Sequence, residues 1–439
     1  MSKEVRWQRS ALPPLEPRLQ RRYQQLVQEH LQLSQRVAAG LNALPGTGSS
    51  FASTQAAWRF YQNESVRLPA LVQPLLEQAR HSAGAACQEY GLVVHDWSLL
   101  NYHRHASKAD RIGSKRNRAE GYELQTALLL SDRDGQPLAP LVQNLACARG
   151  LYTSRTDDVA VVPTHLDELL VRMDYLAGLS LNRPLVHIID REGDSVGHYR
   201  QWQAHTFLVR AKGRQRVQWQ DQSWMLGSVA EQLRHQLMFC RSVDFQGKPA
   251  RQYVTETEVV LSRRTRQKRR GKRPRSEAAA PVKLRLIVSE VRADDGKVLS
   301  VWLLLSNAKG AVEAGQLALW YYWRWRIESF FKLLKSAGQQ VEHWQQESGL
   351  AVAKRLLIVS MACVLVWQLA RAQTPQAEQL RQVLVRLSGR QMKRARPWTA
   401  PALLEGVWVL LSMLDLLEHH DLSKLRDLAK TFFQPNSQT

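Results

Sequence analysis

Three acidic residues stand where a carboxylate is costly without a nearby cation. Asp96 follows the apolar run "LVV" in "YGLVVHDWSLLNYH", and Asp190 ends the strand-like run "PLVHIID". Glu328 is the only acid in "YYWRWRIESFFKLLKSAG", among aromatic and basic residues. A carboxylate in apolar surroundings needs a metal ion or a cationic side chain to compensate it. A single aspartate on a strand is more often a turn or capping residue, so the argument depends on all three acids together.

Carboxylates from two strands and one helix can hold two Mg²⁺ ions, for which Mn²⁺ can substitute. Two such ions, roughly 3.5–4 Å apart, activate an attacking water or hydroxyl and stabilise the leaving oxygen at a phosphorus centre. The sequence therefore predicts that Asp96, Asp190 and Glu328 are catalytic metal ligands for phosphoryl transfer.

The segment around Glu328 predicts one helix that begins near Gln316, and residues 320–335 of this helix have two different faces. At about 100° per residue, a narrow polar stripe lies opposite a broad apolar face. The stripe consists of Tyr321, Arg324, Glu328, Lys332 and Lys335. A solvated face with i,i+4 ion pairs is the alternative. Because one acid stands among several cations, we favour a site in which the cations bind DNA phosphates and Tyr321 adds a hydrogen bond.

The overall charge points to a polyanionic partner. The 439 residues include 61 Lys and Arg against 39 Asp and Glu, a formal charge of +22. Nine of the thirteen residues 263–275 are basic, which predicts phosphate contacts, with a mobile solvated loop as the alternative. An anionic membrane surface is the competing partner. The longest uncharged apolar stretch, residues 356–370, is shorter than the roughly 20 residues needed for a membrane span, so we expect a buried helix.

The N-terminal residues lack the apolar core of a signal peptide, and the four cysteines show no metal-binding or disulfide spacing. We therefore expect a cytoplasmic protein. Its pattern predicts three regions. They are an N-terminal helical DNA-binding domain (1–75) with a second helix capped by Ser53 or Thr54, an α/β core (76–345) with a β-rich insertion at about 213–300, and a C-terminal helical domain (346–439).

Two motifs give the chain a family resemblance. "YYWRWRIESFFKLLK" matches a Y-x2-R-x3-E-x6-K signature through Tyr321, Arg324, Glu328 and Lys335, and "DREGD" and "HDWS" contain the other two acids. The chain thus resembles the DDE transposases of the insertion-sequence-four family, in the branch that includes the transposase of the kanamycin-resistance transposon numbered five. Trp97 follows the first acid where that family often has Thr or Ser.

The resemblance implies a ribonuclease-H-like catalytic core that uses Mg²⁺ for cut-and-paste transposition of a bacterial insertion sequence. It implies binding to terminal inverted repeats, cleavage through a DNA hairpin, and joining of 3′ ends to target DNA by a homodimer that pairs through its C-terminal helices. Arg210 matches a phosphate-binding arginine, and Trp302 matches an aromatic residue that receives a flipped base. A non-cleaving regulator of transposition and a nuclease for branched DNA are the alternatives.

Overall fold

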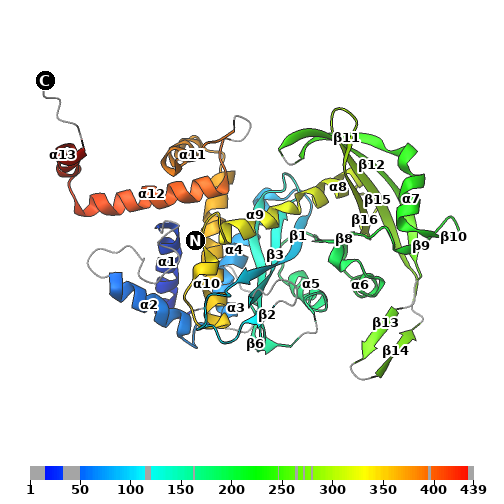
Figure 1. Ribbon diagram of the computed structural model, residues 1–439, viewed down its shortest axis with the longest axis horizontal. Helices are drawn as coiled ribbons and strands as arrows, with labels where there is room; N and C mark the ends of the chain where they lie inside the picture. Colours follow the sequence, from blue (N-terminus) through cyan, green and yellow to red (C-terminus); the bar gives the residue numbers. More distant parts are fainter. Residues whose placement is uncertain are drawn as a thin grey trace, which may run out of the picture.

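The computed structural model describes most of the chain, and the elements of Figure 1 follow its order. The described residues are 15–32, 50–113, 120–161, 164–245, 247–262, 265–269, 272–277, 280–393 and 397–433. The N-terminal helices are α1 (Pro17–Gln32), α2 (Ser50–Gln62), α3 (Leu68–Leu71) and α4 (Gln73–Ala86). The second helix therefore begins at Ser50, and the prediction of a cap at Ser53 or Thr54 is wrong. Residues 33–49, between α1 and α2, lie outside the described residues.

A mixed sheet forms the centre of the molecule. Its strands β1 (Gly91–Asn101), β3 (Glu120–Ser131) and β4 (Pro137–Cys147) are antiparallel neighbours, whereas β7 (Leu185–Ile189) and β8 (Thr206–Arg210) continue on the other side of β1 in parallel. The smaller elements of this region are β2 (Ile112–Gly113), β5 (Gly150–Thr153), β6 (Thr156–Ala160), α5 (Leu169–Ala177), η2 (Arg191–Gly193) and α6 (Val196–Gln201). Three antiparallel strands followed by two parallel ones are compatible with a ribonuclease-H-like core.

The region after β8 is rich in strands and extends the same sheet. It contains β9 (Arg216–Trp219), β10 (Gln222–Met225), α7 (Leu226–Gln232), η3 (Arg234–Gln236), β11 (Met238–Phe245), β12 (Lys248–Leu261), β15 (Val282–Arg292) and β16 (Val298–Ser306). Because β16 pairs with β8, the insertion and the core share one continuous sheet. Between β12 and β15, β13 (Thr265–Arg269) and β14 (Lys272–Glu277) form a separate two-stranded sheet.

The helix predicted over residues 320–335 is in fact two helices, α8 (Ala314–Trp323) and α9 (Trp325–Leu334), that meet at Arg324. At the junction, the Arg324 amide donates to the Tyr321 carbonyl at 3.0 Å, and the Ile327 amide donates to the Arg324 carbonyl at 3.2 Å. These hydrogen bonds span three residues, not four, so the chain tightens into a single 3₁₀-like turn. The junction places Tyr321 and Arg324 where the two helices meet, beside the middle of β1 and the end of β7.

The C-terminal region is helical and packs into the same core as the N-terminal helices. After η4 (Val341–His343) come α10 (Gly349–Arg371), α11 (Pro375–Ser388), α12 (Ala400–His419) and α13 (Leu422–Phe433). Helix α10 packs against β4 and against α1 to α4, α11 and α12, so the three predicted regions share one hydrophobic core. A second core lies between the insertion sheet and α5, α6 and α7. The predicted boundary at residue 75 falls inside α4.

Two described helices are long and apolar enough to cross a membrane by length and composition alone. The apolar window of α10 is 89% buried inside the protein, as predicted for the stretch at residues 356–370, and it is a core helix. The corresponding window in Ala400–Glu418 is only 28% buried. Helix α12 therefore presents a largely uncovered apolar surface, which extends from the body in Figure 1.

Candidate active site

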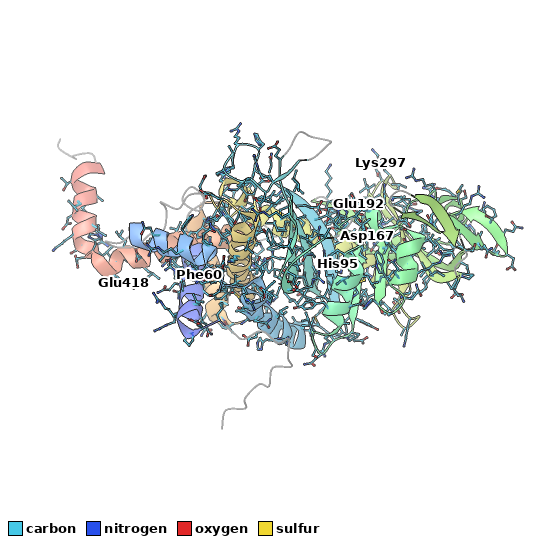
Figure 2. All side chains as sticks on the ribbon, turned by 90° about the horizontal axis from the view of Figure 1, so that it is seen from below. Phe60, His95, Asp167, Glu192, Lys297 and Glu418 are labelled. Atoms are coloured by element: carbon cyan, nitrogen blue, oxygen red, sulfur yellow. The ribbon has the colours of Figure 1, made fainter. Side chains whose placement is uncertain are left out.

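Two parallel strands bring Asp96, in the middle of β1, and Asp190, directly after the end of β7, to the same level of the sheet. His95 on β1 pairs with Ile189 at the end of β7, and each aspartate follows directly in its chain. Asp190 caps η2 by accepting a hydrogen bond from the Arg191 amide at 2.7 Å, and Asp96 accepts one from the Trp97 amide at 2.9 Å. Figure 2 shows His95 in the middle of the elongated molecule, between the helix that carries Phe60 and the insertion that carries Lys297.

Arg324 joins the first and third acids. One guanidinium nitrogen lies 2.8 Å from Asp96, and the other lies 2.9 Å from Glu328. The Arg324 side chain is only 4% exposed and lies over the Trp325 ring at 5.2 Å. The structure therefore places Arg324 inside the acid cluster, and not on the outer surface where the stripe predicted a phosphate contact.

Tyr321 joins the second acid to the same junction. Its hydroxyl donates to Asp190 at 2.9 Å, and its ring packs edge-on against Trp302 at 5.7 Å between ring centroids. The Tyr321 side chain is buried, so its hydroxyl is used to orient a carboxylate. Through Arg324 and Tyr321, the α8–α9 junction contacts all three predicted acids.

Asp96 and Asp190 differ in proton affinity. Burial raises the pKa of Asp96 to about 6; the Arg324 guanidinium opposes this shift, whereas Glu328 and Asp190 add to it. Burial also acts to raise the pKa of Asp190, but Arg324, the Arg191 amide and the Tyr321 hydroxyl outweigh it, so this pKa lies below its ordinary value. The pKa of Arg324 is raised although burial opposes it, because Tyr321, Asp96 and Asp190 surround it. One acid is thus held ionised, while the other titrates near neutral pH.

The acid cluster fits a hard divalent cation in its chemistry, because three carboxylate groups supply the oxygen ligands that Mg²⁺ and Mn²⁺ prefer. The positive charge that such a site requires is here provided by Arg324, which contacts two of the acids. Within the described ranges, no three His, Cys, Asp or Glu side chains lie close enough together to hold one metal ion. Two of the three carboxylates, those of Asp96 and Glu328, instead pair with the Arg324 guanidinium.

The raised pKa of Asp96 makes metal binding dependent on pH. A metal ion binds the ionised carboxylate, so above pH 6 no proton has to be released from Asp96, whereas below pH 6 one does. We expect the Mg²⁺ affinity, measured by calorimetry, to fall by about tenfold for each pH unit below 6. The same titration of Asp96→Asn should show a weaker and much flatter profile. An unchanged wild-type affinity between pH 7.5 and pH 5 would show that Asp96 is not a ligand.

The remaining predicted residues lie at different depths. Lys332 is exposed on α9, and Lys335 at the end of this helix pairs with Glu342 at 3.3 Å. Arg210 ends β8 and lines a pocket beside the acids. Trp302 is only 3% exposed and packs among the rings of Phe245, Tyr321 and Tyr322. Its predicted contact with a flipped base requires these rings to separate.

A cationic pocket, which the sequence motifs did not reveal, lies beside Asp190. Its volume is about 540 Å³, and Arg191, Arg210, Lys212 and Arg214 contribute its cations. Asp194, the last residue of "DREGD", fixes the loop that carries Lys212. It accepts hydrogen bonds from the Lys212 amide at 2.7 Å and from the Tyr199 hydroxyl at 2.8 Å. The two aspartates of this motif therefore differ in role: Asp190 joins the acid cluster, and Asp194 positions the pocket wall.

A second feature missed from the sequence is His165, which lies between Glu123 at 3.3 Å and Glu192 at 3.2 Å. Its ring stacks on Trp97 with 4.0 Å between centroids, so it braces the residue that follows Asp96. Burial lowers the pKa of His165, but the two glutamates outweigh burial and the net pKa is raised. No local motif marks this histidine, because its partners come from three separate segments.

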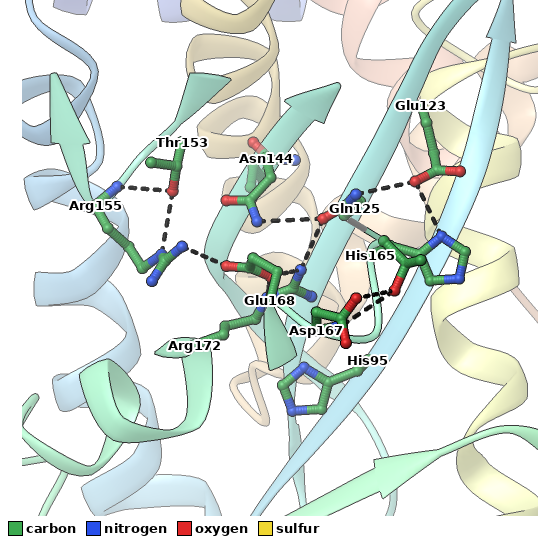
Figure 3. A network of polar contacts seen from close by, with 12 residues as sticks. His95, Glu123, Gln125, Asn144, Thr153, Arg155, His165, Asp167, Glu168 and Arg172 are labelled. Atoms are coloured by element: carbon green, nitrogen blue, oxygen red, sulfur yellow. Dashed lines mark hydrogen bonds and ion pairs between the residues drawn. The ribbon is translucent and has the colours of Figure 1, made fainter. Parts of the chain in front are cut away.

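Figure 3 shows the polar network that connects His165, through Glu123 and Gln125 on β3, with Arg172. Gln125 donates to Glu123 at 2.9 Å and accepts from the fully buried Arg172 at 3.0 Å. Arg172 also pairs with Glu168, which in turn pairs with Arg155. A buried charge is tolerated only when it is paired and hydrogen-bonded, so this network fixes the positions of its members.

The carboxylate triad consists of an acid within β1, an acid directly after β7 and an acid on α9, an arrangement of the kind used for phosphoryl transfer. In agreement, residues 88–365 match the family model described as the transposase DDE domain. The match covers well over half of the chain, and the chain belongs to this family. It is a transposase whose substrate is DNA. No match was found among curated proteins.

Proposed function

We propose that this transposase moves a bacterial insertion sequence by a cut-and-paste route within the cytoplasm. In this proposal it binds terminal inverted repeats, cleaves through a hairpin intermediate and joins the 3′ ends to target DNA. The signature of Tyr321, Arg324, Glu328 and Lys335 supports the insertion-sequence-four family, and within it the branch that includes the transposase of the kanamycin-resistance transposon numbered five. The observation that carries the proposal is the convergence of Asp96 and Glu328 on Arg324, with Asp190 held by Tyr321 of the same junction.

Asp96, Asp190 and Glu328 are the residues that would hold two Mg²⁺ ions, or Mn²⁺ in their place. Such ions, when bound, activate the attacking hydroxyl and stabilise the leaving oxygen. Before that, Arg324 supplies the compensating charge and keeps Asp96 and Glu328 facing one another. Its guanidinium can then turn to a DNA phosphate, which reconciles its buried position with the proposed phosphate contact.

Cations around the cluster suit the DNA strands on either side of the scissile bond. Lys332 is exposed on the helix that carries Glu328, and Lys335 lies one turn further on. On the other side, the pocket with Arg210 adjoins Asp190. Phosphate oxygens accept hydrogen bonds from Arg and Lys, and these contacts position the duplex without reading its sequence. We assign Lys332, Lys335 and Arg210 to phosphates, and Trp302 to an extruded base once its ring cluster opens.

A groove between α1 and α2 suits the terminal repeats. Its volume is about 650 Å³, and its cationic lining consists of Arg18, Arg21, Arg22 and Arg59. Trp58 on α2 is 39% exposed and lies next to Arg59 in the chain, so an aromatic surface adjoins the cations. A basic helix pair of this kind can lie along a DNA backbone and project side chains into a groove.

The homodimer that we propose pairs through α12. Large apolar side chains are exposed along its length: Val409, Met413, Leu414, Leu416 and Leu417. An apolar helix face of this extent is typical of a protein interface. A second copy of the same helix would cover these side chains in a two-fold arrangement.

One observation favours the alternative, a non-cleaving regulator that occupies DNA. Arg324 already neutralises Asp96 and Glu328, so the cluster is stable without a metal ion. The two functions are separated by incubating the purified protein with Mg²⁺ and a duplex that carries its own terminal repeats. We expect strand scission and hairpin-ended products on a denaturing gel, and tight binding without scission in either Mg²⁺ or Mn²⁺ would establish the regulator instead.

A further inference from the structure

The basic segment between β12 and β15 folds as a two-stranded ribbon. Strands β13 and β14 pair in antiparallel register, with Arg266 opposite Ser276 and Arg269 opposite Lys272. The eleven residues of the two strands include six basic ones and a single acid, Glu277. The basic ones are Arg266, Lys268, Arg269, Lys272, Arg273 and Arg275. These residues therefore form strands and are not the mobile solvated loop that was the alternative prediction for residues 263–275.

The ribbon lies at the tip of the longer hairpin formed by β12 and β15, and this hairpin connects it to the rest of the protein. Strands β12 and β15 are paired as far as Leu261 and Val282, and the ribbon continues from there as a sheet of its own. In Figure 1 it extends beyond the insertion sheet, on the opposite side of the molecule from α1 and α2. It has the form of an arm, and it lies far from the groove that the proposed function assigns to the terminal repeats.

The composition of the arm indicates its ligand. Six cations on two short strands repel one another, and an isolated two-stranded hairpin is marginally stable in water. Both strands are edges, but the dense charge and Pro274 oppose pairing with another β-strand. A polyanion removes the repulsion, and a two-stranded ribbon is narrow enough to lie along or enter the major groove of duplex DNA.

We propose that the β13–β14 arm binds the phosphate backbone of duplex DNA outside the terminal repeats, independently of base sequence. This inference rests on the proposed function, because it takes the terminal repeats to be bound by the N-terminal helices. The arm extends the DNA contact beyond the catalytic cluster and holds the flanking or target duplex close to it. Because phosphate contacts release counterions, the salt dependence of binding reports on them directly.

The test compares two triple variants that lose the same charge. Arg266→Gln/Lys268→Gln/Arg269→Gln alters the arm, and Lys424→Gln/Arg426→Gln/Lys430→Gln alters exposed cations of α13. Binding to a random-sequence duplex is measured by fluorescence anisotropy at several salt concentrations. We expect the arm variant to lower the slope of log K against log salt by about 2–3, and the α13 variant to leave it unchanged.

A second variant removes the arm as a whole, by joining residue 262 to residue 281 through a short turn, which leaves the β12–β15 pairs intact. It should keep the melting temperature of the parent and lose at least as much slope as the triple arm variant, because it removes more of the basic residues. Equal slopes for the arm and α13 variants, or an effect confined to repeat-bearing DNA, would overturn the proposal. Cleavage of repeat DNA by the parent is scored separately. If the arm variants lose slope but the parent does not cleave repeat DNA, only the proposed function is refuted. If the parent cleaves repeat DNA but the arm variants keep the parental slope, only the proposed role of the arm is refuted.

Discussion

Replacing Asp96 with asparagine, or Glu328 with glutamine, should abolish DNA cleavage and leave DNA binding close to that of the parent. Each change keeps the size of the side chain but removes a negative charge from the acid cluster. Loss of a metal ligand in phosphoryl transfer removes several kcal/mol of transition-state stabilisation, so we expect cleavage to fall by about a thousandfold or more. Single-turnover cleavage in Mg²⁺ measures the rate, and anisotropy without metal measures binding.

Asp294→Asn is the matched control, because this carboxylate is highly exposed on the insertion and pairs only loosely with Arg251 at 3.6 Å. It should retain the parental cleavage rate. Substantial cleavage by Asp96→Asn or Glu328→Gln would mean that the cluster is structural. The acids would then serve to hold Arg324 in place, and the phosphoryl-transfer chemistry would have to reside elsewhere in the chain.

Replacing Arg324 with methionine should destabilise the fold and make its stability dependent on divalent metal. The change leaves the half-buried Asp96 carboxylate without its guanidinium partner, and breaking a buried ion pair costs about 3 kcal/mol. Without the guanidinium, the pKa of Asp96 rises further above about 6. A carboxyl whose folded pKa is raised weakens the fold when ionised, so the loss should be largest at pH 8 and shrink as the pH is lowered through that pKa.

Mg²⁺ should restore the melting temperature of Arg324→Met far more than it raises that of the parent, because the ion replaces the lost positive charge. The double variant Arg324→Met/Asp96→Asn removes both partners, and it should be more stable than Arg324→Met alone. Parental stability for Arg324→Met, with no response to Mg²⁺, would show that Arg324 is not the cation that balances the cluster.

Much of the core could be predicted from local patterns. The apolar runs around Asp96 and before Asp190 formed β1 and β7, because apolar strands of this length are buried on both faces of a central sheet. The uncharged stretch at residues 356–370 became part of the buried helix α10. The break at Arg324 could not be predicted, since helical periodicity runs through it. At the break, Arg324 pairs with Asp96, which is distant in the sequence and which the periodicity cannot reveal.

The three acids could be singled out from the sequence, whereas the residues that surround them could not. Each acid stood in a motif, whereas His165 and the cationic pocket are assembled from separate segments whose proximity only folding creates. The helical wheel assigned Tyr321 and Arg324 to DNA because it contained no information about the strands opposite them. In the fold, both residues contact carboxylates, and Trp302 lies beneath them in the core.

Asp96, Asp190 and Glu328 are proposed to form one divalent-metal centre, in which Arg324 bridges Asp96 and Glu328 before metal and DNA bind. Anomalous diffraction from crystals of the DNA-bound protein grown with Mn²⁺ tests this proposal most directly. We predict Mn²⁺ peaks within bonding distance of all three carboxylates, with the Arg324 guanidinium turned away towards a phosphate. Manganese bound elsewhere, or an Arg324 that still bridges Asp96 and Glu328 in the DNA complex, would contradict it.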